Sequence, residues 1–171
     1  MSEPTPTQRQ QQVDAFIAAL ERLDSAGRAR LKRNAGRTLH EARDVHRVFF
    51  RALPYQVARR PEEEIYFLVA TLYPLAEARN DGTSLGATLR AVRQLRQSES
   101  LDRRFQALLD SDIEQMHFRL RQMVRLIAAS EQRIDWKQLL NDLLAWGHPE
   151  RYVQLRWARD YFVGQPNAVA S

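Results

Sequence analysis

Apolar residues recur at helical spacing along most of the chain, and no segment alternates apolar and polar residues as a half-buried strand does. In the first half, Val13, Phe16, Ile17 and Leu20 follow this spacing behind Thr7 and Gln10, which form a capping-box pair. Ser25 is the predicted cap of a second helix, which glycines at 27 and 36 weaken. The pattern therefore predicts helices over about 7–23, from Ser25, over about 41–53 up to Pro54, and from Pro61 onward with a kink at Pro74.

The stretch "NDGTS" at 80–84 is the clearest break in this pattern, because its turn-forming residues lead into a Ser84 cap. Beyond it, Ser111 with Glu114 and Asp135 with Gln138 are predicted cap pairs, and Pro149 marks the start of the last helix. The predicted helices of this half span about 84–97, 101–110, 112–129, 135–146 and 149–163.

The predicted fold class is therefore all-α, with about eight to nine helices arranged as two small helical-bundle lobes. The lobes are expected at 13–82 and 83–163, between a flexible N-terminal segment (1–12) and a frayed tail (164–171). At 171 residues with 44% hydrophobic composition, the chain can bury a core without covalent staples. It has no cysteine, which excludes disulfides and thiolate chemistry. With no apolar segment of signal-peptide or membrane-spanning character, we expect a soluble, cytoplasmic protein without a membrane partner.

Positive charge is concentrated early in the chain. Residues 25–60 hold ten basic side chains against two acidic ones, whereas residues 61–82 hold one against five. All but two of the 26 basic residues are arginines, which bind phosphate through two parallel hydrogen bonds and stack on rings. This composition fits a polyanionic partner, and it equally fits a genome rich in arginine codons.

Several predicted helices carry basic residues opposite their apolar stripes. Arg30, Arg33 and Arg37 lie at i, i+3 and i+7, opposite Leu31 and Ala35. In the helix from 112, Phe118 accompanies two arginines on the predicted outer face, as Tyr152 does in the last helix, and exposed rings of this kind can stack on bases. Ordinary solvated faces, with the rings buried against another lobe or chain, are the alternative. The candidate nucleic-acid-binding residues are Arg28, Arg30, Lys32, Arg33, Arg37, Arg90, Arg93, Arg121, Arg125, Arg156 and Arg159.

No catalytic constellation is present in the sequence. Glu114 and His117 have the Glu-x-x-His spacing of carboxylate-bridged iron sites, but such a site needs two of these pairs, and Glu114 is already explained as a capping residue. The other histidines lack partners at zinc spacing, and there is no glycine-rich phosphate loop or nucleophile elbow. We therefore predict no enzymatic activity, no metal and no cofactor.

The order of several segments resembles the CasB family, the small subunit of the type I-E CRISPR surveillance complex Cascade. The resemblance covers roughly residues 13 to 162 and runs through "GRARLKRNAG", "FLVATLYPLA", "SLGATLR", "RRFQALLDSD", "LRQMVRLI", "DWKQLLNDLLAW" and "VQLRWARDYF". Its most specific parts are two blocks of residues. The first is Asp135–Trp136, Leu139–Leu140 and Asp142–Leu143 with Trp146, and the second is Trp157–Ala158 with Tyr161.

The resemblance implies a non-catalytic, all-helical, two-lobed protein present as two copies in a ribonucleoprotein for antiviral defence. Its implied partners are crRNA and target DNA, other Cascade subunits including the CasC-type backbone, and a second copy of itself. Arginines of 27–37 would hold phosphate and stabilise the opened DNA strands, while guide pairing reads the sequence.

Two other functions remain open from the residues alone. One is a helical adaptor whose arginines and aromatic rings bind an acidic protein. The other is a stand-alone DNA-binding regulator, although no helix-turn-helix with base-reading residues at a recognition-helix start is evident.

Overall fold

The computed structural model describes residues 6–166. Within this range the chain forms nine α-helices and no strand, so the predicted all-α class is confirmed; the one β-like pairing there is an isolated bridge between Ala78 and Ile134. The helices are α1 (Gln8–Glu21), α2 (Ser25–Arg33), α3 (His46–Ala52), α4 (Glu63–Leu72), α5 (Leu85–Arg96), α6 (Ser100–Leu109), α7 (Ile113–Ala129), α8 (Trp136–Leu144) and α9 (Tyr152–Phe162), with short 3-10 turns η1 (Tyr55–Val57) and η2 (Tyr73–Leu75).

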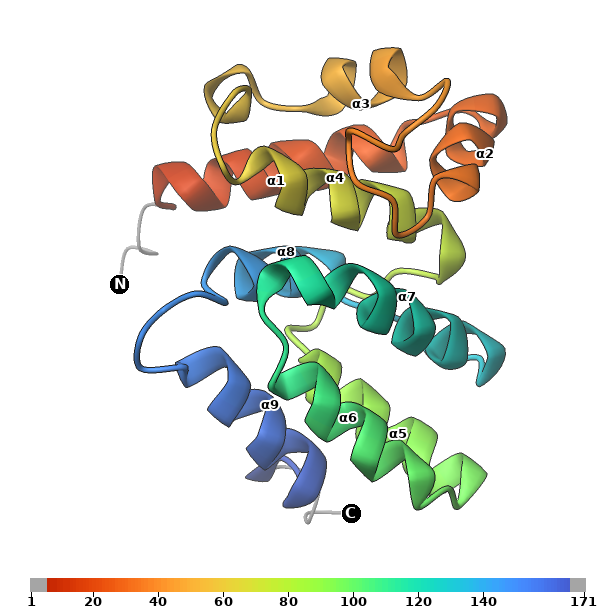
Figure 1. The fold of residues 1–171 in the computed structure, drawn as a ribbon, viewed down its shortest axis with the longest axis vertical. Helices are drawn as coiled ribbons and strands as arrows, with labels where there is room; N and C mark the ends of the chain where they lie inside the picture. The colour runs from red at the N-terminus through yellow and green to blue at the C-terminus, as the bar shows by residue number, and fades with distance from the viewer. Residues whose placement is uncertain (1–5, 167–171) are drawn as a thin grey trace.

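The helices are stacked along the long axis of the molecule (Figure 1). Helices α1 to α4 occupy one end, α5, α6 and α9 occupy the other, and α7 and α8 lie between them. α8 packs on α1 and α4, while α5 packs most extensively on α9. The middle pair therefore connects the helices of the two ends.

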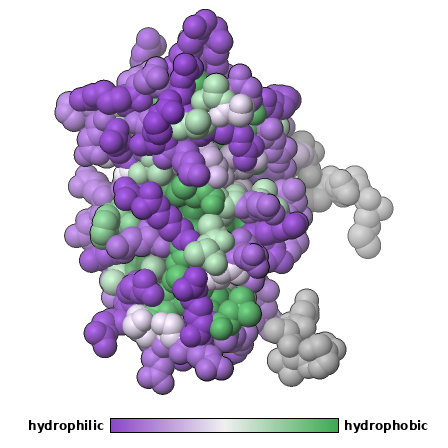
Figure 2. All heavy atoms as spheres, turned by 90° about the vertical axis from the view of Figure 1, so that its right-hand side faces the viewer, coloured by the Kyte–Doolittle hydropathy of each residue, from purple (hydrophilic) through white to green (hydrophobic). Residues whose placement is uncertain are grey.

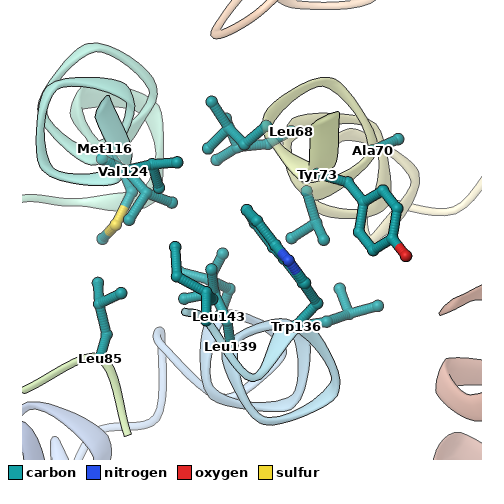
Figure 3. Close-up of a cluster of buried hydrophobic side chains, with 14 of the residues drawn as sticks. Leu68, Ala70, Tyr73, Leu85, Met116, Val124, Trp136, Leu139 and Leu143 are labelled. Atoms are coloured by element: carbon teal, nitrogen blue, oxygen red, sulfur yellow. The ribbon is translucent and has the colours of Figure 1, made fainter. Parts of the chain in front are cut away.

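Buried side chains from both halves of the chain join in one hydrophobic cluster. Figure 3 shows its centre, where Leu68 of α4, Val124 of α7 and Leu139 of α8 point toward one another. The rings of Tyr73 and Trp136 lie there with centroids 5.5 Å apart. The division into lobes at 13–82 and 83–163 stays a prediction. Residues 8–12, assigned to the N-terminal segment, belong to α1, and residues 1–5 and 167–171 lie outside the described range.

Three of the predicted helix caps are confirmed. The side chains of Thr7, Ser84 and Asp135 accept hydrogen bonds from the backbone N–H groups of Gln10, Ala87 and Gln138, respectively. These caps depend on residues only three positions apart, so local sequence suffices to predict them.

Two other predicted caps are wrong, each by one residue. Asp24, rather than Ser25, caps α2, its Oδ1 accepting from the Gly27 N–H at 2.7 Å. Asp112 and Gln115, rather than Ser111 and Glu114, form the capping box of α7. Ser111 is instead buried, and its hydroxyl donates to the Ala107 carbonyl at 2.7 Å, so it closes the end of α6.

Three predicted helices also differ in extent. The run at 41–53 is helical only over α3, because Asp44 adopts a left-handed conformation with φ 56°. The last helix begins at Tyr152 rather than Pro149, after Arg151 with φ 51°. Instead of kinking a continuous helix, Pro74 lies in η2, which follows the end of α4 at Leu72.

Candidate nucleic-acid interface

The basic segment of residues 27–37 ends in a turn held by a buried amide. Asn34 is 2% exposed, and its Nδ2 donates to the carbonyls of Arg30 at 2.8 Å and Arg43 at 2.9 Å. Its Oδ1 accepts from the Arg43 N–H at 2.9 Å. This side chain therefore joins the end of α2 to the segment before α3.

The same turn is attached to two other helices. The Gly36 N–H donates to Thr71 Oγ1 of α4 at 3.2 Å, and Arg121 of α7 donates to the Ala35 carbonyl at 3.3 Å. Gly36 has φ +78°, and a Cβ there would lie 2.8 Å from Arg121 Cδ. Arg121, predicted on the outer face of its helix, is therefore half-buried there, because its side chain lies against the turn after α2.

This contact brings two of the predicted basic groups together. Lys32, Arg33 and Arg37 are exposed at the end of α2 and in the turn after it. Arg125 is exposed one helical turn beyond Arg121 on the same face of α7. We call this set the α2–α7 surface: Lys32, Arg33, Arg37, Arg121 and Arg125.

An exposed aromatic ring borders the α2–α7 surface. Phe118 precedes Arg121 by three residues on α7 and is 63% exposed. Figure 2 views the molecule from the side on which α2 and the C-terminal end of α7 lie in Figure 1. This side is largely hydrophilic, with apolar patches between the polar residues. The arrangement offers both charge and a stacking face.

Arg28 and Arg30 have partners within the protein. Arg28 lies over the Tyr73 ring, 5.4 Å from its centroid. Burial raises the pKa of Tyr73, and the nearby Glu21 adds to this, whereas Arg28 acts in the opposite direction. Arg30 forms an ion pair with Asp44, with Nε and Oδ2 3.5 Å apart. Arg28 thus packs on a ring of η2, whereas the Arg30–Asp44 pair is exposed to solvent.

Arg90 and Arg93 join α5 to its neighbours. Arg90 donates to the Tyr161 carbonyl near the end of α9 at 2.8 Å. Arg93 makes two hydrogen bonds to Asp102 of α6, at 2.6 and 3.2 Å, and the Tyr161 hydroxyl donates to the same carboxylate. These bonds, that from Arg93 first, hold the pKa of Asp102 below its usual range. The two arginines are therefore engaged in intramolecular contacts.

The arginines of α9 differ from each other. Arg156 donates to the carboxylate of Asp142, whose side chain is 4% exposed and also accepts from Trp157 Nε1 at 2.8 Å. Arg159 is exposed and makes no side-chain hydrogen bond or ion pair within residues 6–166. A helical wheel assigns both residues to the outer face, but only Arg159 has its charge available there.

Sequence reasoning did not single out the arginines of α3. Arg47, Phe50 and Arg51 are all exposed on this helix at i, i+3 and i+4, and Tyr55 just beyond it is 87% exposed. Their alternation of charge and aromatic rings is visible in the sequence, and the spacing of Arg47, Phe50 and Arg51 gives them one face in the predicted helix over 41–53 as well as in α3.

Glu114 and His117 are placed on α7 as their spacing predicts. No group of three or more potential metal ligands occurs among residues 6–166. Over the same range, no helix combines the length and apolar character needed to cross a membrane.

Comparison with known proteins tests the resemblance seen in the sequence. The model of the family described as CRISPR-associated protein Cse2 matches residues 27–162. A CRISPR-associated protein Cse2 from Thermus thermophilus is 45% identical over 121 residues, covering 66% of this chain and 68% of the relative. The chain belongs to the Cse2 family.

Solved structures of similar proteins share the fold. The crystal structure of M. ruber CasB has a TM-score of 0.75 at 34% identity, over 90% of this chain and 93% of the other. A chain of a CRISPR RNA-guided surveillance complex has a TM-score of 0.76 at 25% identity, over 94% and 97%. The resemblance of this Cse2-family chain to CasB is thereby confirmed.

Proposed function

We propose that this Cse2-family chain is the non-catalytic small subunit of a Cascade-type complex and that its α2–α7 surface binds nucleic-acid phosphate. Membership of the family supports the first part, together with the similarity to a chain of an RNA-guided surveillance complex. In this role the subunit contacts crRNA and other Cascade subunits, and it stabilises the DNA strands opened by guide pairing.

The observation that carries the phosphate-binding role is the junction of Arg121 with the turn after α2. Hydrogen bonds attach the turn after α2 to α7 and to α4. The exposed basic side chains of two segments distant in sequence are therefore held next to each other. Arginines on a rigid framework neutralise phosphates regardless of base sequence, and the exposed Phe118 ring can stack on an unpaired base. The surface therefore suits an extended strand bound without sequence preference.

The salt dependence of binding tests this role. The variant Arg33→Ala/Arg37→Ala removes two exposed charges of the α2–α7 surface. Each lost phosphate contact should reduce the slope of log affinity against log salt by about 0.7 for single-stranded or 0.9 for duplex DNA. We expect a total decrease of roughly 1.4 to 1.8, with no preference among unrelated sequences.

The matched control is Arg103→Ala/Arg104→Ala, which removes two exposed charges from α6. This control should leave the slope unchanged. Equal slopes in both variants would contradict the role of the α2–α7 surface. Absence of any nucleic-acid binding, together with loss of assembly in both arginine variants, would favour the helical adaptor for an acidic protein.

A further inference from the structure

A groove of about 710 Å³ opens where the start of α4, the α6–α7 turn and the α8–α9 loop meet. It is lined by residues from all three regions, including Ile65, Ile113, Leu144 and Pro149. The volume is within the range of ligand sites and larger than a single side chain requires. We refer to it as the α4–α9 groove.

Two residues that line the α4–α9 groove each carry a buried acceptor without a partner among residues 6–166. Gln154 is 7% exposed, and its Nε2 donates to the Trp146 carbonyl at 2.8 Å. Because a carbonyl can only accept, the nitrogen of the Gln154 amide must face the Trp146 carbonyl. The amide oxygen, Oε1, therefore points away from this bond. That oxygen is buried and has no hydrogen-bond partner within residues 6–166. Burying an unpaired acceptor is unfavourable unless a donor from elsewhere completes it.

Glu62 supplies the second acceptor. Its Oε2 is also buried without a partner among the described residues, and its side chain makes no capping bond although it precedes the first residue of α4. The helix dipole stabilises part of its charge there but provides no donor to that oxygen. A carboxylate oxygen just before α4 and an amide oxygen of α9 therefore lack donors, and both belong to residues that line the same groove.

The charge of the groove is opposite to that of the α2–α7 surface. Glu62, Asp110 and Asp112 line it, against the single guanidinium of Arg151. That guanidinium is already occupied, since it donates to the Leu109 carbonyl at 2.8 Å and lies 3.9 Å from Asp110. The groove therefore disfavours phosphate and favours a cationic group with several donors.

We propose that the α4–α9 groove receives an arginine side chain from a different protein chain. A guanidinium carries donors in a planar fork and can serve two acceptors on separate elements, which a lysine ammonium does less well. Its methylene stem would contact the apolar lining, and the remaining volume would accommodate the flanking peptide. That this partner is another subunit of the surveillance complex rests on the proposed function.

The arginine site is tested on the isolated chain by NMR titration with acetyl-arginine methylamide. We expect saturable shifts of the Gln154 side-chain amide and the Trp146 indole N–H. Acetyl-citrulline methylamide, which has the same length without the charge, should bind at least about tenfold more weakly because charged hydrogen bonds are the stronger ones. Equal binding of both compounds, or no saturable shift, would overturn the proposal.

The variant Glu62→Gln identifies the acceptor. It removes the charge and breaks no side-chain hydrogen bond formed within residues 6–166, so it should not destabilise the protein. We expect at least about tenfold weaker binding of the arginine compound. The control Glu150→Gln changes an exposed carboxylate that does not line the groove and should leave binding unchanged. Equal affinities of the two variants would overturn the assignment of Glu62.

Experiments with a reconstituted complex then distinguish a failure of the arginine site from a failure of the proposed function. Glu62→Gln should lower incorporation of the subunit while leaving the salt slope of its own nucleic-acid binding intact. If wild-type protein fails to assemble or to bind nucleic acid, the proposed function fails and the titration result still stands. Self-association of the isolated chain that Glu62→Gln abolishes would assign the groove to a second copy and overturn the choice of a different chain.

Discussion

The side chain of Arg121 occupies the space beside Gly36 that any larger residue would need. A Cβ at Gly36 would lie 2.8 Å from Arg121 Cδ, and the glycine has φ +78°. The guanidinium meanwhile donates to the neighbouring Ala35 carbonyl. The glycine of the turn after α2 and the arginine of α7 therefore fit each other although they are far apart in sequence.

Gly36→Ala should destabilise the protein through both backbone and packing. The left-handed conformation alone disfavours alanine by about 1–2 kcal/mol. Gly82→Ala is a matched control, because Gly82 has φ +77° and nothing within 4 Å of an added Cβ. We expect Gly36→Ala to lower the free energy of unfolding by roughly 1 kcal/mol more than Gly82→Ala. Equal losses in chemical denaturation would show that Arg121 moves aside without cost.

Gly86→Ala tests the close approach of α5 and α9. An added Cβ would lie 2.3 Å from the Trp157 carbonyl oxygen, a backbone atom that cannot rotate away. Alanine normally stabilises a helix interior relative to glycine by about 0.5–1 kcal/mol, so a loss here must come from overpacking. We expect a loss of roughly 2–3 kcal/mol in thermal or chemical denaturation. Gly147→Ala, with nothing within 4 Å, should change stability little.

Arg156→Ala should lower the free energy of unfolding more than Arg159→Ala does. Removing Arg156 leaves the nearly buried Asp142 carboxylate without its cation, which typically costs about 3–5 kcal/mol for a fully buried pair. Arg156 is itself 40% exposed, so we expect roughly 2–3 kcal/mol here. Arg159→Ala removes an exposed charge and should shift stability by less than about 0.5 kcal/mol. Similar melting curves for the two variants would contradict this distinction.

Acid should weaken the Asp102 network. Hydrogen bonds from Arg93 and Tyr161 lower the pKa of Asp102 in the folded state. A group with a depressed folded pKa stabilises the fold above its unfolded value of about 3.9, and this contribution is lost as the pH falls through the folded pKa. The stabilities of wild type and Asp102→Asn should therefore differ most near pH 6 and converge as the pH falls through the lowered folded-state pKa of Asp102. Parallel curves across this range would exclude a role for the ionised carboxylate.

Local chemistry explains which parts of the fold the sequence predicts well. Ser84 and Asp135 act within one helical turn, so their caps follow from adjacent residues. Ser111 fails as a cap because Arg119 and the Ala107 carbonyl both bond its hydroxyl, at 2.7 Å each. The bond to Ala107 is a local i−4 contact, whereas the bond from Arg119 of α7 depends on how two helices pack, which local sequence does not show.

The candidate site shows the same limit. A helical wheel correctly marks Arg125 and Arg159 as exposed, because only their own helix matters. It cannot show that α8 brings Asp142 to Arg156, or that the turn after α2 covers Arg121. Some basic residues have a carboxylate or a carbonyl of another helix or turn as partner, and others have none. Only the packing of separate helices shows which residues belong to which group.

Arg125 and Arg121 should separate binding from folding on the α2–α7 surface. Arg125 is exposed and has no side-chain hydrogen bond or ion pair within residues 6–166, so Arg125→Ala should leave the free energy of unfolding within about 0.5 kcal/mol of wild type. If Arg125 contacts phosphate, the salt slope of nucleic-acid binding should fall by about 0.7 to 0.9.

Arg121→Ala should change both quantities, because the same side chain packs on Gly36 and bonds Ala35. Arg121→Lys keeps the charge and much of the stem, so it should retain more of the salt slope than Arg121→Ala does. The measurements are salt-dependent gel shifts and urea denaturation of all three variants. If Arg125→Ala left the slope unchanged while Arg121→Ala lowered stability alone, α7 would support the turn after α2 without touching nucleic acid, and the phosphate contacts would have to come from α2 itself.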